Sequence, residues 1–175
     1  MLEKLKTRTL IDEATLQARI TELGKKITAD FRGETVTIIG VLKGSFIFLA
    51  DLVRKIDLST RIEFIGVSSY HGTESTGHVR ITQDLTTEVK GKNIIVVEDI
   101  VDTGLTMDYL INTLRVREPK ALKICTLLSK PEAHMMKTQL DYIGFEISNE
   151  FVIGYGLDLD GEYRNVPYIA QVISD

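Results

Sequence analysis

Strand and helix patterns of hydrophobic residues alternate along the chain. Apolar residues recur every three or four positions from Ile11 to Gly33, which predicts a helix with Asp12 as its N-cap and Gly33 as its stop. Continuous apolar runs, typical of strands buried on both faces, occur at residues 35–42, 94–97 and 121–128. Further strands are expected at 61–67, 79–82, 141–147, 151–156 and 168–174, and further helices at 46–56 and from about Met107. The alternation predicts an α/β fold, a single domain with a twisted, mostly parallel central sheet flanked by helices.

The run at 94–97 leads into an acidic and then a glycine-containing segment. Glu98 and Asp99 follow it directly, and Asp102 precedes the run Thr103-Gly104-Leu105-Thr106 and the helix from Met107. A loop between a strand and a helix N-terminus presents backbone N–H groups at the positive end of the helix dipole, which favours phosphate. Adjacent carboxylates repel phosphate unless the ligand donates hydroxyls to them or a divalent cation bridges them. A phosphorylated sugar with Mg²⁺ meets both conditions.

A second strand–loop–helix candidate follows the run at 35–42. Lys43 supplies positive charge, Gly44 allows close approach of a backbone, and Ser45 is expected to be an N-cap and a donor. A Lys-Gly pair alone is more often a turn than a site. Its place at the carboxyl end of a predicted parallel strand, where open α/β sheets bind ligands, favours a site.

Two further segments are candidates by position. Residues 68–78 are polar and glycine-bounded, which is typical of a surface loop or of a mobile lid that shields a reaction from water. Lys130 follows the strand at 121–128 and precedes Pro131, a position that directs an ammonium towards the ligand crevice. A lysine at the end of a strand is more often simply solvated than part of a site. The loop histidines His71 and His78 lack a third metal ligand, so they are more readily explained as solvated side chains.

The acidic segment resembles the signature of the type I phosphoribosyltransferases. That signature is two acidic residues, two apolar residues and then Asp-Thr-Gly-x-Thr. The sequence of residues 98–106 is most similar to the signature of the hypoxanthine-guanine branch. Five motifs in family order extend the resemblance from Leu42 to Arg164. The resemblance implies one domain over residues 1–175, with a small hood built from the terminal segments and a flexible loop. It also places a lid at about 68–84 and a base-binding hood segment at about 130–165.

The resemblance also implies a role for each matching residue. Asp102 is the expected catalytic acid or base at the purine, and Ser69 and Tyr70 belong to the lid. The residues expected to bind phosphoribosyl are Glu98, Asp99, Asp102, Thr103, Gly104, Leu105 and Thr106. Those expected to bind pyrophosphate are Lys43, Gly44 and Arg164, often with a cis peptide before the lysine. Those expected to bind the purine are Lys130, Phe151, Val152 and Asp158, and the expected metal ligands are Glu98, Asp99 and Asp158.

The implied reaction is one of purine salvage. The 5-phosphoribosyl group of phosphoribosyl pyrophosphate passes to hypoxanthine, and to guanine, with Mg²⁺ as cofactor, and the enzyme is expected to be a homodimer or homotetramer. Two alternatives remain open: a phosphoribosyltransferase for adenine, orotate, uracil or xanthine, and a phosphoribosyltransferase-like regulator that binds RNA. A doubly wound domain with incidental acids would predict no Mg²⁺-dependent release of pyrophosphate.

Composition narrows these possibilities. The chain has 175 residues, 43% of them hydrophobic, which suits one domain with a substantial core. Its net charge of -4 and the lack of a basic block argue against a nucleic-acid partner. No apolar run approaches the ~18 residues of a membrane span, and the first residues lack the apolar core of a secretory signal, so a cytoplasmic location is expected. The single cysteine, Cys125, is expected in the core.

Overall fold

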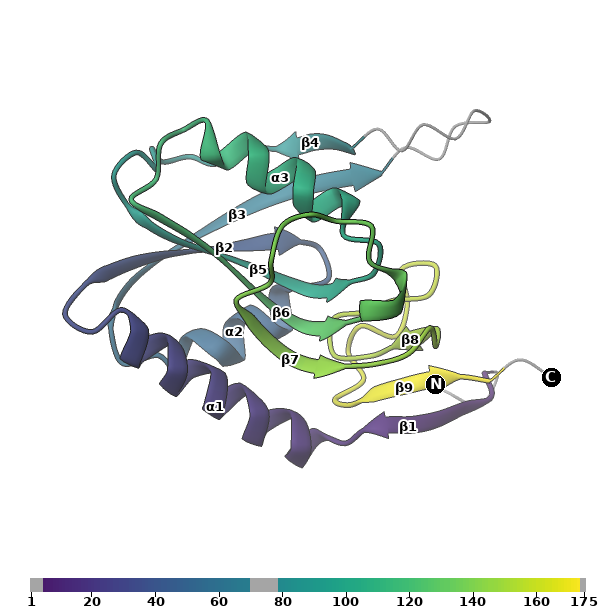
Figure 1. Ribbon diagram of the computed structural model, residues 1–175. Helices are drawn as coiled ribbons and strands as arrows, with labels where there is room; N and C mark the ends of the chain where they lie inside the picture. Colours follow the sequence, from purple (N-terminus) through teal and green to yellow (C-terminus); the bar gives the residue numbers. More distant parts are fainter. Residues whose placement is uncertain (1–4, 70–78, 174–175) are drawn as a thin grey trace.

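The computed structural model describes residues 5–69 and 79–173. Strands and helices alternate along most of its length (Figure 1). In chain order the elements are β1 (Thr7–Ile11), α1 (Glu13–Asp30), β2 (Thr35–Leu42), α2 (Phe46–Val53), β3 (Ser59–Ser69), β4 (Val79–Gln83), β5 (Asn93–Val101), α3 (Leu105–Arg115), β6 (Ala121–Ser129), a 3-10 turn (Pro131–Ala133), β7 (Tyr142–Glu146), β8 (Val152–Ile153) and β9 (Ile169–Val172).

A six-stranded sheet in the order β4-β3-β2-β5-β6-β7 forms the centre of the fold. All of its neighbouring strands are parallel except β4, which runs antiparallel to β3. Helices α1 and α2 cover one face and α3 covers the other (Figure 1). The predicted single α/β domain with a mostly parallel sheet flanked by helices is therefore confirmed.

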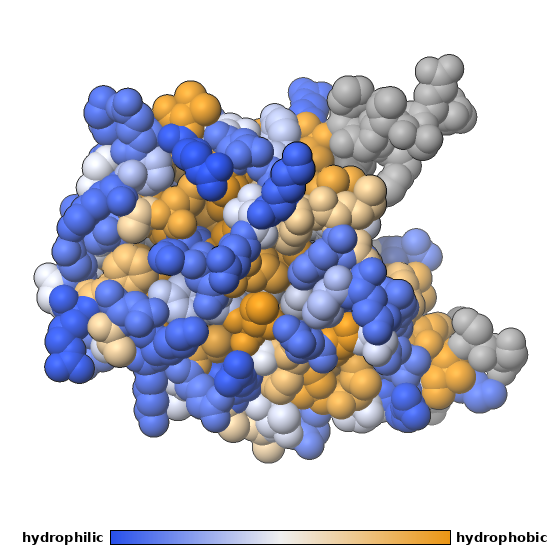
Figure 2. Space-filling view, viewed as in Figure 1, coloured by the Kyte–Doolittle hydropathy of each residue, from blue (hydrophilic) through white to orange (hydrophobic). Residues whose placement is uncertain are grey.

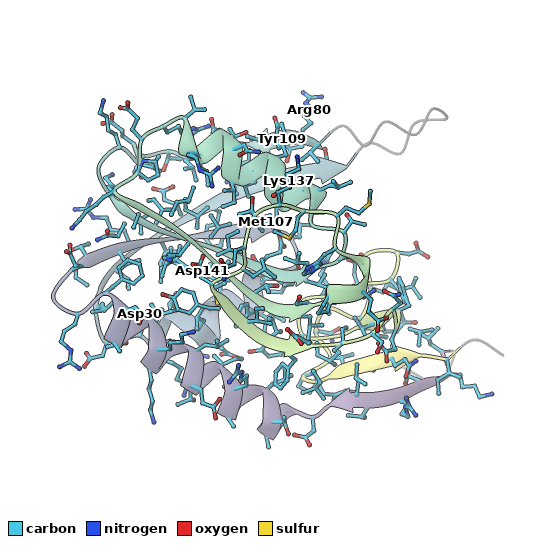
Figure 3. All side chains as sticks on the ribbon, viewed as in Figure 1. Asp30, Arg80, Met107, Tyr109, Lys137 and Asp141 are labelled. Atoms are coloured by element: carbon cyan, nitrogen blue, oxygen red, sulfur yellow. The ribbon has the colours of Figure 1, made fainter. Side chains whose placement is uncertain are left out.

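Alternation along the central strands builds a core on each face of the sheet. Ile38 of β2 faces α1 and α2, whereas its neighbour Ile39 belongs to the cluster around α3. The side chain of Met107 in α3, labelled in Figure 3, packs against the sheet, and the residue is 2% exposed. Cys125 is completely buried, as expected, and burial raises the pKa of its thiol. Both clusters are apolar, which leaves the polar chemistry to the ends of the strands.

The helix boundaries differ in detail from the predictions. Asp12 caps α1 by accepting a hydrogen bond from the Thr15 N–H at 2.7 Å, as predicted. The predicted stop at Gly33 is wrong, because α1 ends at Asp30 and Gly33 lies in the following turn with a φ of 79°. Helix α2 ends at Val53 rather than at residue 56. The apolar periodicity extends past the ends of α1 and α2 because the residues beyond them, Phe31 and Ile56, still pack into the core. The pattern therefore predicted longer helices than the structure has.

A three-stranded sheet, β1-β9-β8, forms the hood beside the carboxyl end of the central sheet (Figure 1). Strand β1 was missed, because Thr7–Ile11 has no clear alternation of apolar residues. The strand predicted at 151–156 contains only Val152–Ile153. Beyond it, Gly154, Tyr155 and Gly156 all have positive φ values of 93°, 52° and 104°, which turn the chain out of the sheet.

Hydrophilic residues cover most of the face shown in Figure 2, where they separate smaller hydrophobic patches. Within the described part of the chain, no helix is both long and apolar enough to cross a membrane.

Candidate active site

The candidate site lies where β2 and β5 separate. These adjacent strands pair from Val36 and Asn93 as far as Gly40 and Val97, and β2 makes no further pairs with β5 beyond that point. The chain continues from β2 to β3 on one side and from β5 to β6 on the other. Such a switch point leaves a crevice beyond the carboxyl ends of the strands, which is the usual ligand position in open α/β sheets. Both candidate loops, at Lys43 and at Asp102, leave the sheet here.

The acidic pair lies inside strand β5 and not after it. The strand continues to Val101, so the predicted end at Val97 is wrong by four residues. The cause is pairing with β6, which continues through Glu98 and Thr126 to Val101 and Ser129 and holds the acidic segment extended. Burial, followed by the negative charge of Asp99, raises the pKa of Glu98 well above its usual range. Two adjacent carboxylates that resist joint ionisation favour a ligand that brings a cation or hydroxyl donors.

The predicted phosphate cradle encloses a cavity of about 120 Å³. Strand β5 ends at Val101, and α3 begins four residues later at Leu105. Gly104 takes the N-cap position with a left-handed φ of 77°, which a side chain would strain. The Thr103 hydroxyl lies 3.5 Å from the Leu105 N–H. The residues that line the cavity are Glu98, Ile100, Val101, Asp102, Thr103, Gly104, Thr106 and Met107.

A segment that sequence reasoning missed covers this cradle. The N–H groups of Met135 and Met136 donate to the carbonyl of Thr103 at 2.8 and 3.2 Å. A Cβ atom on Gly104 would overlap the Met136 side chain. Asp108, in the first turn of α3, accepts hydrogen bonds from the N–H groups of Lys137 and Thr138 at 2.9 and 3.0 Å. Figure 3 shows Lys137 close to α3. No local pattern signals these contacts, because about thirty residues separate the partners.

Lys130 joins the cradle to the end of β6. Its ammonium lies 3.2 Å from Oδ2 of Asp102, and the lysine is only 8% exposed. Its backbone N–H donates to the carbonyl of Val101 at 2.9 Å, which ties β6 to the strand that carries the acids. Two residues predicted to act on the same purine are therefore in direct contact.

The loop after β2 packs against the acidic pair. The peptide bond between Leu42 and Lys43 is cis, as the resemblance implied. A Cβ atom on Gly44 would overlap the carboxylate of Asp99, so the close backbone approach predicted for Gly44 is made to Asp99. The N-cap hydrogen bond expected from Ser45 is wrong, because its buried hydroxyl instead donates to the carbonyl of Val41 at 2.6 Å. Lys43 remains exposed.

The hood loop meets the Lys43 loop from the other side. Arg164 forms an ion pair with Asp158 at 2.6 Å and donates to the carbonyl of Gly156, also at 2.6 Å. The carbonyl of Gly44 lies so close to Gly156 that a Cβ atom there would overlap it. Glycine at position 156 lets the two backbones touch, which brings the Arg164 loop and the Lys43 loop to one region.

The predicted purine-binding pair lies at the start of β8. Val152 is 6% exposed and belongs to the core, whereas the Phe151 side chain is 52% exposed. The carbonyl of Phe151 accepts a hydrogen bond from Val172 of β9 at 2.9 Å, which fixes the backbone in the hood sheet. An exposed ring on a fixed backbone is available to stack on a flat ligand, whereas the alternative of a core aromatic does not describe Phe151.

The predicted metal ligands do not form one cluster. Within residues 5–69 and 79–173, no three His, Cys, Asp or Glu side chains are grouped so as to hold a metal ion. Mg²⁺ usually binds one or two carboxylates together with substrate phosphates, so the acidic pair and the Asp158 region still fit it. In the lid, Ser69 is the last residue of β3, and β4 returns antiparallel from Val79, so both strands occupy part of the predicted range 68–84. Tyr70 and the rest of the lid loop, including His71 and His78, lie outside the described residues.

Comparisons with known proteins agree on one family. Residues 9–160 match the family described as "Phosphoribosyl transferase domain". Hypoxanthine phosphoribosyltransferase of Escherichia coli (strain K12) is 44% identical over 167 residues, 94% of each chain. The "Bifunctional protein TilS/HprT" of Listeria innocua is also 44% identical, over 163 residues, and there the chain spans only 25% of that protein's length.

A solved structure shares the fold along nearly the whole chain. It is a crystal structure of a hypoxanthine-guanine phosphoribosyltransferase from Bacillus anthracis with a HEPES molecule in the active site. The TM-score is 0.92 at 48% sequence identity, and the match covers 97% of this chain and 99% of the other.

Proposed function

This chain belongs to the phosphoribosyltransferase family, and from that premise we propose that it transfers the 5-phosphoribosyl group of phosphoribosyl pyrophosphate to hypoxanthine, and also to guanine. The products are IMP or GMP and pyrophosphate, and the reaction depends on Mg²⁺. The observation that carries the proposal is the cavity of about 120 Å³ whose lining includes Glu98 and the Asp102–Thr106 loop. It joins a phosphate-binding helix N-terminus to carboxylates suited to sugar hydroxyls.

The cradle holds the 5′-phosphate. Residues 103–106 offer backbone N–H groups and the hydroxyls of Thr103 and Thr106 at the N-terminus of α3. Glu98 and Asp99 then accept hydrogen bonds from the ribose hydroxyls, or would hold Mg²⁺ beside them. Burial and then the charge of Asp99 raise the pKa of Glu98, and a hydroxyl donor or a cation at this position would stabilise its ionised form.

The pyrophosphate end is assembled from two loops. Lys43 and the backbone at Gly44 approach from β2, and Arg164 approaches from the hood. A guanidinium fork suits a phosphate group. Arg164 either leaves its ion pair with Asp158 to bind pyrophosphate or binds both at once. Asp158 or the acidic pair would hold Mg²⁺, which would neutralise charge on the departing pyrophosphate.

The Lys130–Asp102 pair matches one edge of a 6-oxopurine. The ammonium of Lys130 donates to the oxygen at position 6, and the neighbouring Asp102 carboxylate accepts a hydrogen bond from N7–H. Adenine carries an amino donor at position 6, which Lys130 would oppose. Phe151 stacks on the purine ring, and the backbone of Val152 pairs with its edge.

In the proposed reaction, N9 of the purine bonds to carbon 1 of the ribose as the bond to pyrophosphate breaks. Asp102 takes the N7 proton, so the purine ring of the nucleotide product is neutral. The transition state has the oxocarbenium character of glycosyl transfer, which nearby carboxylates stabilise. Proton transfer by a positioned side chain contributes about 10²- to 10⁴-fold to such rates. The lid, Ser69 and Tyr70, is proposed to exclude water.

The test is nucleotide formation from phosphoribosyl pyrophosphate with hypoxanthine, guanine, xanthine and adenine in separate assays, each with and without Mg²⁺. We expect IMP and GMP only with Mg²⁺ and little product from adenine. Product from adenine or xanthine alone would move the enzyme to another branch of the family. No pyrophosphate release with any base would remove the proposal.

We also propose that the enzyme is a homodimer or homotetramer. Three large apolar side chains, Phe46, Ile62 and Phe64, are 37% to 43% exposed and offer surface for self-association. Light scattering of the full chain tests this, and a monomer at micromolar concentration would contradict it.

A further inference from the structure

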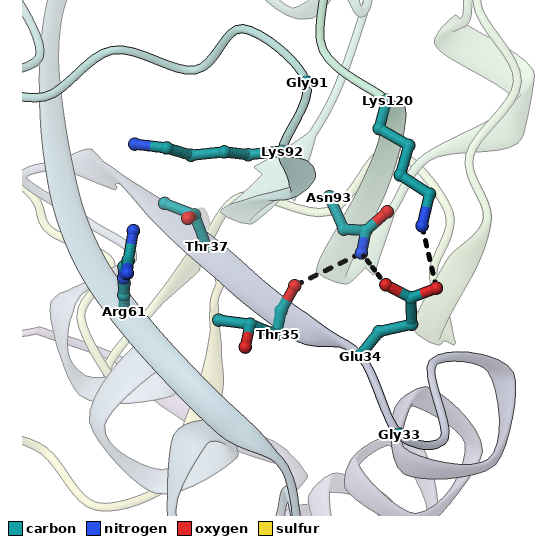
Figure 4. A pocket seen from close by; sticks show the side chains of 9 residues that line it. All are labelled: Gly33, Glu34, Thr35, Thr37, Arg61, Gly91, Lys92, Asn93 and Lys120. Carbon is teal, nitrogen blue, oxygen red and sulfur yellow. Dashed lines mark hydrogen bonds and ion pairs between the residues drawn. The ribbon is translucent and has the colours of Figure 1, made fainter.

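A second pocket lies at the amino end of the central sheet, away from the candidate active site (Figure 4). Thr35 and Thr37 of β2 line it, whereas the Lys43 loop leaves the opposite end of the same strand. A strand of this length spans roughly 25 Å, so the two sites are separate. The volume is about 390 Å³, within the range of about 300 to 1,000 Å³ that ligand pockets have.

One corner of the pocket is internally satisfied. The carboxylate of Glu34 accepts hydrogen bonds from the ammonium of Lys120 at 2.7 Å and from the amide of Asn93 at 3.2 Å. The Asn93 amide also donates to the carbonyl of Thr35 at 3.2 Å. The Lys120 bond, followed by the Asn93 bond, lowers the pKa of Glu34, so this acid stays ionised and paired at neutral pH. Glu34 therefore neutralises Lys120 and no other cation.

The other corner holds two cations. Arg61 of β3 is in register with Thr37 of β2, and Lys92 immediately precedes β5. Figure 4 shows both side chains reaching into the same side of the pocket near Thr37. Within the described part of the chain, neither side chain has a hydrogen bond or an ion pair. Two like charges directed at one space repel each other unless an anion lies between them.

Glu63, the acid that interacts electrostatically with Lys92, already has hydrogen-bond partners of its own. Burial acts to raise the pKa of Glu63, but hydrogen bonds from Thr87 and Thr86 and the charge of Lys92 bring it below the usual value. The carboxylate of Glu63 already accepts bonds from the Thr86 hydroxyl at 3.0 and 3.2 Å. Glu63 thus interacts with Lys92 only through a longer electrostatic contact, and it forms no ion pair with either cation.

A hydroxyl on the pocket wall completes the corner. Thr37 is 2% exposed and lines the pocket, and no residue among 5–69 and 79–173 makes a hydrogen bond to its side chain. Its hydroxyl is not among the buried side-chain oxygens that lack a partner, so it is open to the pocket, where water can pair with it. A phosphate oxygen in the pocket would take the place of that water.

We propose that this pocket binds a phosphate-bearing metabolite, with its phosphoryl group between Arg61 and Lys92 and within reach of the Thr37 hydroxyl. A guanidinium fork binds two phosphate oxygens at once, and an ammonium adds a point charge. The volume leaves room beyond the phosphoryl group for a second phosphate or a nucleoside. The site is independent of the transferase reaction, since none of its residues lies in the candidate active site.

The experiment is amide NMR of the full chain during titration with orthophosphate, pyrophosphate or a purine nucleoside 5′-monophosphate at constant ionic strength. Amides of Thr37 and Asn93 report on this pocket, and the amide of Gly104 reports on the phosphate cradle. The test variant is Arg61→Gln/Lys92→Gln. The matched control is Arg8→Gln/Lys25→Gln, which removes the same charge from an exposed strand arginine and an exposed helix lysine elsewhere.

We expect saturable shifts of Thr37 and Asn93 in the original chain and in the control. In the test variant the apparent Kd at these amides rises at least about tenfold, while the response of Gly104 is unchanged. Tighter binding of the nucleotide than of orthophosphate would identify a nucleotide site, and equal binding would identify a site for the phosphoryl group alone. Shifts that do not saturate, or that persist unchanged in the test variant, overturn the proposal. Thr37→Val provides a second check, since weaker binding with an unchanged Gly104 response assigns the hydroxyl to the ligand.

Discussion

The proposed sugar-phosphate end and the proposed purine end of the candidate active site are built in different ways. The cradle occupies one continuous segment, from Glu98 in β5 to the first turn of α3. The purine end draws Lys130 from the end of β6, Phe151 from the hood sheet and Asp158 from a loop beyond it. A local strand–loop–helix unit positions its own donors, whereas the purine end depends on long-range contacts such as the Lys130–Asp102 pair. The cradle should therefore tolerate changes in the hood better than the hood tolerates changes in the cradle.

Asp102→Asn should cause the largest loss of activity, because Asp102 belongs to both ends. The amide cannot take the N7 proton, so kcat should fall by about 10²- to 10⁴-fold. The cradle backbone stays intact, and the KM for phosphoribosyl pyrophosphate should therefore change little. Steady-state kinetics with hypoxanthine measure both constants. Asp57→Asn, at an exposed acid away from the site, is the control. An unchanged kcat would exclude Asp102 as the base.

Gly44→Ala should impair the sugar-pyrophosphate end selectively. The added methyl group would overlap the Asp99 carboxylate, so Asp99 must move from its place beside the proposed ribose site. We expect a loss of at least about tenfold in kcat/KM for phosphoribosyl pyrophosphate, from disturbance of a charged hydrogen-bonding group. The KM for the purine substrate, which Phe151 is proposed to bind, should be affected less. Circular dichroism would establish that the fold is retained. Equal losses for both substrates would show that the loop is not specific to one end.

Lys130→Ala should impair the purine end. Loss of a hydrogen bond from a charged donor corresponds to about 10- to 100-fold in kcat/KM for hypoxanthine. The same variant should lose little with adenine, which has no oxygen at position 6. Lys137→Ala, at an exposed lysine in the following segment, is the matched control. Equal loss with all bases would mean that Lys130 acts through Asp102 and not on the purine.

Asp108→Asn should have the smallest effect and should test the connection between the two ends. Burial alone would raise the pKa of Asp108, but hydrogen bonds from Thr138 and the Lys137 backbone outweigh it and bring the pKa below its usual value. A lowered folded-state pKa contributes stability that is present above the unfolded value and is lost as pH falls through the folded one. The native Tm should therefore decline below about pH 4, and the variant should decline less steeply.

At pH 7 the same substitution should cost about 1 kcal/mol, since Asp108 is only partly buried. For a chain of this size that corresponds to a decrease of about 2 to 4 °C in Tm. Calorimetry across the pH range measures both effects. A variant with an unchanged Tm at pH 7 would show that the 135–138 segment is held over the cradle by other contacts.

The comparison also explains which predictions from sequence were accurate. Strands 35–42 and 121–128 and the Asp12 cap depend on local patterns, and each appears where expected or extends by one residue. Errors occurred where a distant element decided the outcome. Strand β5 continues to Val101 because β6 pairs with it. One error was local: Ser45 is the N-cap residue of α2, but its hydroxyl donates to the carbonyl of Val41 instead of to the helix.

The hood shows the same limit. Strand β1 has little pattern of its own and becomes a strand because β9 pairs with it. Phe151 looked like a core aromatic as readily as a stacking one, and only the hood geometry leaves its ring exposed. Met136 and Asp108 carried no signal, because their role arises from contacts made across the fold.

By itself the sequence determined the α/β class, the acidic segment, the glycine-containing cradle and the family that these residues resemble. These features depend on side-chain chemistry and spacing within a few turns of chain. Only the tertiary structure decided that Lys130 contacts Asp102, that Gly44 packs on Asp99 and that Arg61 and Lys92 share a pocket at the opposite edge. Such contacts join residues from different strands, and their distances depend on sheet order and register, which no local pattern of hydrophobic and polar residues specifies.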